Sequence, residues 1–139
     1  MKNYYIASCS CGKDSLAMVY RLIDEGKPLN EIVFYDTGME FEAIYNNWSA
    51  LKIFASEKHI KCTTLEPECD FLWKMLEKPV NVGKPNEHKG YSWCGGVCRW
   101  GTTEKLKSID KHCESKGAFV YVGIAADETR RLQKENCLL

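Results

Sequence analysis

The residues best suited to chemistry lie near the start of the chain, in the stretch Ser8–Ser15. This stretch reads Ser-Cys-Ser-Cys-Gly-Lys-Asp-Ser and combines a glycine and a lysine with hydroxyl and thiol side chains. Gly12 allows a ligand to approach the backbone closely, Lys13 supplies a positive charge, and Ser10 and Ser15 supply hydroxyl donors. This combination of residue types predicts a site for phosphate.

The surrounding sequence predicts that the stretch joins a strand to a helix. An apolar run precedes it, and the apolar residues after it have the spacing of one helix face: Leu16, Val19, Tyr20 and Ile23. The first N–H groups of a helix have no partner inside the helix, and the helix dipole favours an anion there. The alternative is an ordinary helix start capped by Asp14 or Ser10, but capping gives no reason for the adjacent Gly-Lys pair.

The loop resembles that of a known nucleotide-binding group. The Walker pattern does not fit, because Ala7 stands in place of its first glycine and Asp14 follows the lysine. Instead, residues 10–15 resemble the Ser-Gly-Gly-Lys-Asp-Ser loop of the PP-loop ATP pyrophosphatases. That group includes the phosphoadenosine phosphosulfate (PAPS) reductase family, to which this chain is most similar. The resemblance implies that the nucleotide-binding residues are Ser8, Ser10, Cys11, Gly12, Lys13, Asp14 and Ser15, with Lys13 and Asp14 in catalytic roles.

One position of the loop differs from the family pattern. Cys11 stands where the family usually has a second glycine. If the backbone there requires a positive φ or a very close approach, the Cβ of Cys11 carries a conformational cost.

Composition places the chain among ordinary globular proteins. Its 139 residues fit one domain, 1–139, with 45% hydrophobic and 27% charged residues. Lys plus Arg and Asp plus Glu number 19 each, so net charge gives no indication of nucleic-acid binding. No apolar stretch approaches the length of a transmembrane helix or a signal peptide. We therefore expect a cytoplasmic protein whose eight cysteines are reduced thiols.

The order of predicted elements is typical of an α/β fold. The first helix should end near Glu25, since Gly26 suits a C-terminal cap and Pro28 follows. Strands are expected at 31–35, 61–65 and 119–122, and helices at 41–58, 71–76 and around 106–113. Residues 78–96 lack a pattern and are expected to form a mobile substrate loop or lid. The resemblance implies a Rossmann-like three-layer fold with four parallel strands in the order 3-2-1-4, helices on both faces, and a missing C-terminal part.

Two more motifs follow predicted strands. Asp36-Thr37-Gly38 resembles the family segment that lies against the nucleotide, although these residues also suit a simple turn. Residues 123–129 resemble the family's Gly-x-Arg-x-x-Glu-Ser segment through Gly123, Glu128 and Thr129. Ala125 stands where that segment usually has an arginine, and Arg130 or Arg131 could replace the cation. The resemblance places adenine near Phe34, Gly123 and Ile124.

A cysteine-rich segment completes the candidate site. Cys94 and Cys98 flank two glycines, and Arg99 and Lys105 follow them. In the family such a segment lies near the substrate, so we assign Arg99, Lys105 and Arg130 to the substrate and Cys94 to catalysis. A second Cys pair that would complete a zinc site is absent from the sequence. An iron–sulfur cluster on Cys94 and Cys98 is conceivable, but we favour two buried or reactive thiols.

These motifs lead to three hypotheses. The first is a PAPS reductase-like enzyme core that binds ATP, with Mg²⁺, or PAPS, and acts at the α-phosphate side on an unknown acceptor. It would be a transferase that adenylates with release of pyrophosphate, or an oxidoreductase that reduces a sulfonucleotide. The second is a non-catalytic nucleotide-binding module that works with a protein partner, because the reductases' C-terminal Glu-Cys-Gly-x-His motif is absent. The third is a thiol or iron–sulfur redox protein built on Cys94 and Cys98.

Overall fold

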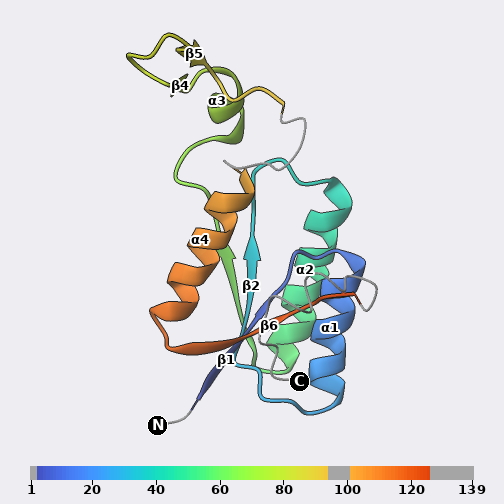
Figure 1. Ribbon diagram of the computed structural model, residues 1–139. Helices are drawn as coiled ribbons and strands as arrows, with labels where there is room; N and C mark the ends of the chain where they lie inside the picture. Colours follow the sequence, from blue (N-terminus) through green and yellow to red (C-terminus); the bar gives the residue numbers. More distant parts are fainter. Residues whose placement is uncertain (1–2, 94–100, 126–139) are drawn as a thin grey trace.

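A parallel β-sheet forms the centre of the protein. The structure is a computed structural model that describes residues 3–93 and 101–125. The sheet has the strand order β3-β2-β1-β6 (Figure 1). Its strands are β1 (Tyr4–Ser8), β2 (Glu31–Tyr35), β3 (Lys61–Leu65) and β6 (Ala118–Val122), and all neighbours pair in parallel. The predicted α/β Rossmann-like fold and its strand order are confirmed. None of the helices in the described part is long and apolar enough to cross a membrane.

Helices cover both faces of the sheet. Helices α1 (Lys13–Asp24) and α2 (Glu42–Glu57) lie on one face, and α4 (Gly101–Glu114) lies on the other (Figure 1). The first face buries the larger core, which includes Val19 of α1 and Trp48, Leu51 and Ala55 of α2. On the second face the buried contacts of α4 come from Ile109 and Cys113. This two-sided burial explains why β2 is a continuous apolar run after its first residue.

Helix α1 ends where the sequence predicts, whereas two apolar residues at predicted helical positions are exposed. Helix α1 ends at Asp24, and Gly26 adopts the predicted left-handed conformation with a φ of 63°. Phe41, the first residue of the helix predicted at 41–58, does not lie on its buried face. It is the N-cap residue of α2, so it precedes the helical stripe and is 85% exposed. Leu106 of α4 shares the predicted spacing but is also exposed.

A small lobe stands beyond the carboxyl ends of the strands. It contains α3 (Phe71–Leu76) and an antiparallel pair, β4 (Pro79–Val80) with β5 (His88–Lys89) (Figure 1). Part of the region expected to be a patternless loop is therefore a hairpin. Helix α3 coincides with the helix predicted at 71–76, but its apolar residues Leu72 and Leu76 are exposed. The buried ammonium of Lys74 instead pairs with Glu104, which ties the lobe to α4.

A buried carboxylate holds the opposite, amino end of the sheet. Glu31 begins β2 and is fully buried. One of its oxygens accepts hydrogen bonds from Tyr4 of β1, at 3.0 Å, and from Lys116. The other oxygen bonds Thr63 of β3 and His112 of α4, the latter at 3.1 Å. One side chain thus connects three strands and the helix on the second face.

These partners make Glu31 a strong acid in the folded protein. Burial alone would raise its pKa, but the hydrogen bonds from Lys116, Thr63, His112 and Tyr4 outweigh burial. They lower the pKa of Glu31 from 4.5 to about 2. Because the folded-state pKa is depressed, this stabilisation is present above the unfolded-state pKa and is lost as pH falls from 4.5 towards 2.

We predict that Glu31 dominates the acid sensitivity of the fold. The free energy of unfolding should fall by about 3 kcal/mol between pH 5 and pH 2 through this one group. Glu31→Gln should be less stable than the parent at neutral pH and should lose much of that dependence. Denaturant titrations at a series of pH values measure both effects. Glu25→Gln, which removes an exposed carboxylate paired with Arg21, should retain the parent's acid dependence. A steep dependence that survives in Glu31→Gln would contradict this assignment.

Candidate functional site

Two of the three predicted motifs meet at the carboxyl edge of the sheet. β1 leads into residues 9–12, and β6, its direct neighbour, leads into Gly123. A Cβ built on Gly123 would lie 3.3 Å from the Cα of Ser15 and 3.4 Å from the carbonyl oxygen of Asp14. The segment after β6 therefore contacts the first turn of α1 through bare backbone. This close approach gives a physical reason for a glycine at position 123.

The start of α1 is not capped by a side chain. Its N-cap residue is Gly12, and no side chain accepts a capping hydrogen bond there. Ser10 Oγ instead lies 3.1 Å from Ser15 Oγ, and Ser15 Oγ donates to the Gly12 carbonyl at 3.1 Å. Within the described residues, no acceptor lies in hydrogen-bonding range of the backbone N–H groups of Lys13, Asp14 or Ser15. These groups point at the position where an anion would be favoured.

The charged side chains of the loop remain available to a ligand. Lys13 and Asp14 are both exposed. In the part of the chain that the structure describes, neither forms an ion pair within 4.0 Å. Lys13 can therefore bind a phosphate without first giving up a partner among residues 3–93 and 101–125. Asp14 offers a carboxylate next to the place where phosphate oxygens would lie.

Cys11 adopts a backbone conformation that favours glycine. Its φ is 57°, in the left-handed region, and its side chain is completely buried. Asn47 of α2 donates a hydrogen bond of 3.0 Å to the Cys11 carbonyl, a contact that the sequence did not reveal. Only the backbone of Cys11 can contact a nucleotide, and the left-handed conformation is held at an energetic cost.

Cys9 and Cys11 form a pair of buried thiols beneath the loop. Their sulfur atoms lie 3.9 Å apart, and the Cys9 sulfur lies 3.7 Å from Ser15 Oγ. The hydrogen bond from the Cys11 thiol is the largest influence on Cys9 and lowers its pKa to about 6, although burial opposes this shift. The positive charge of Lys105 contributes in the same direction. The pKa of Cys11 is raised, because its proton is held in the same bond and its sulfur is buried.

The Asp36-Thr37-Gly38 segment forms a turn closed by its own side chains. Asp36 Oδ1 accepts hydrogen bonds of 2.8 Å from the Gly38 N–H and from the Tyr45 hydroxyl. Thr37 donates to Glu40 at 3.0 Å, and Gly38 has a φ of 80°. The simple turn expected as an alternative is therefore present. It leaves the second Asp36 oxygen without a partner among the described residues.

The remaining predicted residues divide into two groups. The Phe34 side chain is 1% exposed and its ring packs 5.2 Å from that of Trp48, so only its backbone could lie against adenine. Ile124 follows Gly123 and is half-buried. The predicted site residues that lie outside the described residues are Cys94, Cys98, Arg99, Glu128, Thr129, Arg130 and Arg131. Among the described residues, no group of three or more His, Cys, Asp or Glu side chains could hold a metal ion.

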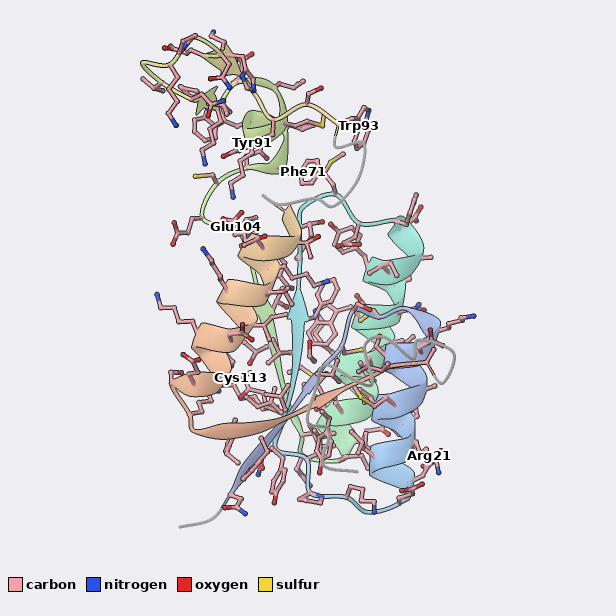
Figure 2. The ribbon with its side chains drawn as sticks, in the orientation of Figure 1. Arg21, Phe71, Tyr91, Trp93, Glu104 and Cys113 are labelled. Atoms are coloured by element: carbon pink, nitrogen blue, oxygen red, sulfur yellow. The ribbon has the colours of Figure 1, made fainter. Side chains whose placement is uncertain are left out.

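A cavity of about 470 Å³ lies on the α4 side of the same edge, and sequence reasoning missed it. Tyr35 at the end of β2 lines it, together with the connection 66–69, Lys74 and Lys78 of the lobe, and Lys107 and Lys111 of α4. Figure 2 shows Glu104 near the end of α4 that faces the lobe carrying Phe71 and Tyr91. Lys107 and Lys111 form no ion pair within 4.0 Å among the described residues. Lys107 and Lys111 are four residues apart, and this spacing could have predicted from the sequence that they lie on the same face of the helix.

Comparison with known proteins adds one distant similarity. No family model matches the chain, and no solved structure matches it. A curated relative from Methanocaldococcus jannaschii is 28% identical over 130 residues, which are 93% of this chain and 24% of the relative. The chain thus spans about a quarter of the length of that protein. The relative is described as uncharacterized, so it assigns no activity to the site.

We predict that backbone strain at Cys11 can be measured by comparing two variants. Cys11→Gly and Cys11→Ala both lose the buried thiol, but only glycine adopts a positive φ without strain. Cys11→Gly should therefore have the larger free energy of unfolding, by about 1 kcal/mol. Chemical denaturation measures the difference. At Ala17, an exposed position inside α1, changing alanine to glycine should have the opposite effect, by about 1 kcal/mol. A Cys11→Ala protein as stable as Cys11→Gly would show that the loop relaxes without strain.

Proposed function

We propose that this chain is a PP-loop enzyme core, similar to the PAPS reductase family, that binds an adenine nucleotide and acts at its α-phosphate side. The observation that carries this proposal is the uncapped start of α1. Three N–H groups there lack acceptors among the described residues, and Lys13 stands beside them without an ion-pair partner. Gly123 brings the end of β6 against the same turn.

The loop would hold the phosphates by its backbone and by one cation. The N–H groups of the first turn of α1 would donate to phosphate oxygens, supported by the helix dipole. Lys13 and the Ser10 hydroxyl would add charge and a further donor. Such a site needs an open backbone surface rather than an enclosed cavity, which is consistent with the cavity lying elsewhere along the edge.

The adenosine would extend along the carboxyl edge of the sheet. Ligands of open α/β sheets bind beyond the carboxyl ends of the strands. The backbone at the end of β2 and at Gly123–Ile124 offers donors and acceptors for the base. Asp36 has one carboxylate oxygen without a partner in the described part, and it lies at the end of β2. We assign it to the nucleotide side of the site.

The chemistry proposed for ATP is transfer of the adenylyl group. A nucleophilic atom of the acceptor would bond to the α-phosphorus as the bond to the bridging oxygen breaks, and pyrophosphate would leave on the loop. The N–H groups and Lys13 would stabilise the charge that develops on the leaving group. Mg²⁺, which binds carboxylates together with phosphate oxygens, would neutralise part of that charge, and Asp14 is the residue placed to hold it. With PAPS, the same site would present the sulfonucleotide to a thiol.

The acceptor would enter from the α4 side. The cavity there lies next to the nucleotide edge, because Tyr35 lines it and Asp36 follows directly. Lys107 and Lys111 would contact an anionic group of the acceptor, and the carboxylates of Glu66, Glu68 and Glu104 on the same lining would contact its cationic or donor groups. Lys105 lies near enough to Cys9 to affect its pKa. Because the chain spans a quarter of its relative, we propose that further segments or a protein partner contribute to acceptor binding. We also propose a cytoplasmic location, in which the cysteines would remain reduced thiols.

We predict that ATP, AMP or PAPS binds the chain and that Lys13 is required. Lys13→Ala should weaken binding of a phosphorylated nucleotide by roughly tenfold or more, because a charge-assisted phosphate contact is lost. Isothermal titration calorimetry measures this. Lys27→Ala, which removes an exposed lysine after the other end of α1, should bind as the parent does. Failure of all three nucleotides to bind, or equal binding by Lys13→Ala, would disprove the proposed function.

Release of pyrophosphate separates the enzyme from a non-catalytic module. ATP is incubated with a panel of anionic acceptors, and pyrophosphate is measured with a coupled assay. Turnover that disappears in Lys13→Ala supports adenylyl transfer. Nucleotide binding without turnover on ATP, and without thiol-dependent reduction of PAPS, supports the module.

A further inference from the structure

Two thiols are in contact directly beneath the phosphate loop. The sulfur atoms of Cys9 and Cys11 lie 3.9 Å apart, and a single residue, Ser10, separates them in sequence. A disulfide bond is about 2 Å long, so the two sulfurs need to approach by roughly 2 Å to form one. Both side chains belong to the core under the loop, while Ser10 between them is exposed.

We propose that Cys9 and Cys11 are a reversible oxidation site, which closes to a disulfide within the loop when the protein meets a peroxide. We further propose that this disulfide switches off phosphate binding. The disulfide itself is independent of the proposed function, whereas the switch rests on it.

The surroundings of the pair favour this reaction. The contact with the Cys11 thiol lowers the pKa of Cys9, which increases the fraction of Cys9 present as the reactive thiolate. Cys11 is held in a left-handed conformation at an energetic cost, which reduces the further cost of rearranging the loop. Both cysteines belong to the short irregular segment 9–12 between β1 and α1, and their side chains point into the core. Local opening of this segment is sufficient to admit a molecule as small as hydrogen peroxide.

The reaction balances with hydrogen peroxide as the oxidant. The Cys9 thiolate attacks one peroxide oxygen, the O–O bond breaks, and one water leaves after protonation. The resulting sulfenic acid is attacked by the Cys11 sulfur, the S–O bond breaks, and a second water leaves as the S–S bond forms. The two thiols together give two electrons to the peroxide. A thiol reductant reverses the step by exchange.

The disulfide would disturb the groups that bind phosphate. The Cys11 carbonyl is held by Asn47 at 3.0 Å, and the Gly12 carbonyl accepts the Leu16 N–H at 3.0 Å. Pulling the Cys11 sulfur towards Cys9 moves the residue that directly precedes Gly12 and Lys13. The N–H groups of the first turn then no longer converge on one position. Oxidation therefore acts on the loop itself rather than at a distance.

Peptide mapping tests the disulfide. The reduced full chain is treated with hydrogen peroxide, alkylated in denaturant and digested with trypsin. Because the next basic residues are Lys2 and Lys13, both thiols lie in the single fragment Asn3–Lys13. We expect this fragment to lose two hydrogen atoms, to carry no alkyl group and to be linked to no other peptide. Cys62→Ser, which removes a third thiol packed against this core, should give the same result. A fully alkylated fragment under conditions that oxidise the exposed Cys69 would overturn the proposal.

Nucleotide affinity tests the switch. Calorimetry with the nucleotide that the reduced protein binds should show roughly tenfold or weaker affinity after oxidation, and dithiothreitol should restore it. Cys11→Ser, or Cys9→Ser if the first variant does not fold, should bind equally well before and after peroxide. Unchanged affinity in a protein whose Asn3–Lys13 fragment is oxidised would overturn the switch. If the reduced protein binds no nucleotide, the proposed function and the switch both fail, and the peptide map alone decides whether the disulfide forms.

Discussion

The fold depends on one buried carboxylate at the amino end of its sheet. Glu31 accepts hydrogen bonds from two neighbouring strands and from α4, so it fixes the distance between the second face of the sheet and its helix. A buried charge of this kind is tolerated only when it is fully paired, and removal of a partner leaves an unpaired charge. The amino end of the sheet is therefore held together by a buried charge with hydrogen-bond partners from several elements. The opposite end can then leave polar groups unpaired and available to ligands.

The carboxyl edge of the sheet contains a strained residue and backbone groups that are unpaired within the described part of the chain. The N–H groups at the start of α1 are not satisfied by a cap, and Cys11 adopts a conformation that suits glycine. Both features reduce stability locally, because a cap is worth about 1 kcal/mol and a left-handed cysteine is strained. Such local costs are common at binding sites and are offset by packing elsewhere. Here the core beneath the loop provides the offset, with Val19, Phe34 and Trp48 all buried.

The sequence predicted the main sheet well because its signals are local. Apolar runs gave β1, β2 and β6, and Gly26 with Pro28 gave the end of α1. Exposed apolar residues such as Phe41 and Leu106 share the spacing of buried ones, so periodicity could not distinguish them. The two-residue strands of the lobe are too short to show a pattern. The partners of Glu31 come from positions 4, 63, 112 and 116, and only the fold brings them together. The lysines around the cavity are likewise brought together only by the fold. The strained position, Cys11, could be identified from the sequence, because the loop pattern that it resembles has a glycine there.

The pairing of β1 with β6 also determines when the site can form. β1 is an inner strand, and its partners on one side come from the far end of the described chain, where Tyr4 pairs with Ala118. Contacts between residues so distant in sequence form slowly, because closing a long loop costs entropy before the contacts are made. During synthesis, β1, α1 and β2 leave the ribosome well before β6 does. Gly123, which follows β6, reaches the first turn of α1 only after β6 has joined the sheet. The loop that comes first in the sequence is therefore among the last parts of the molecule to be completed.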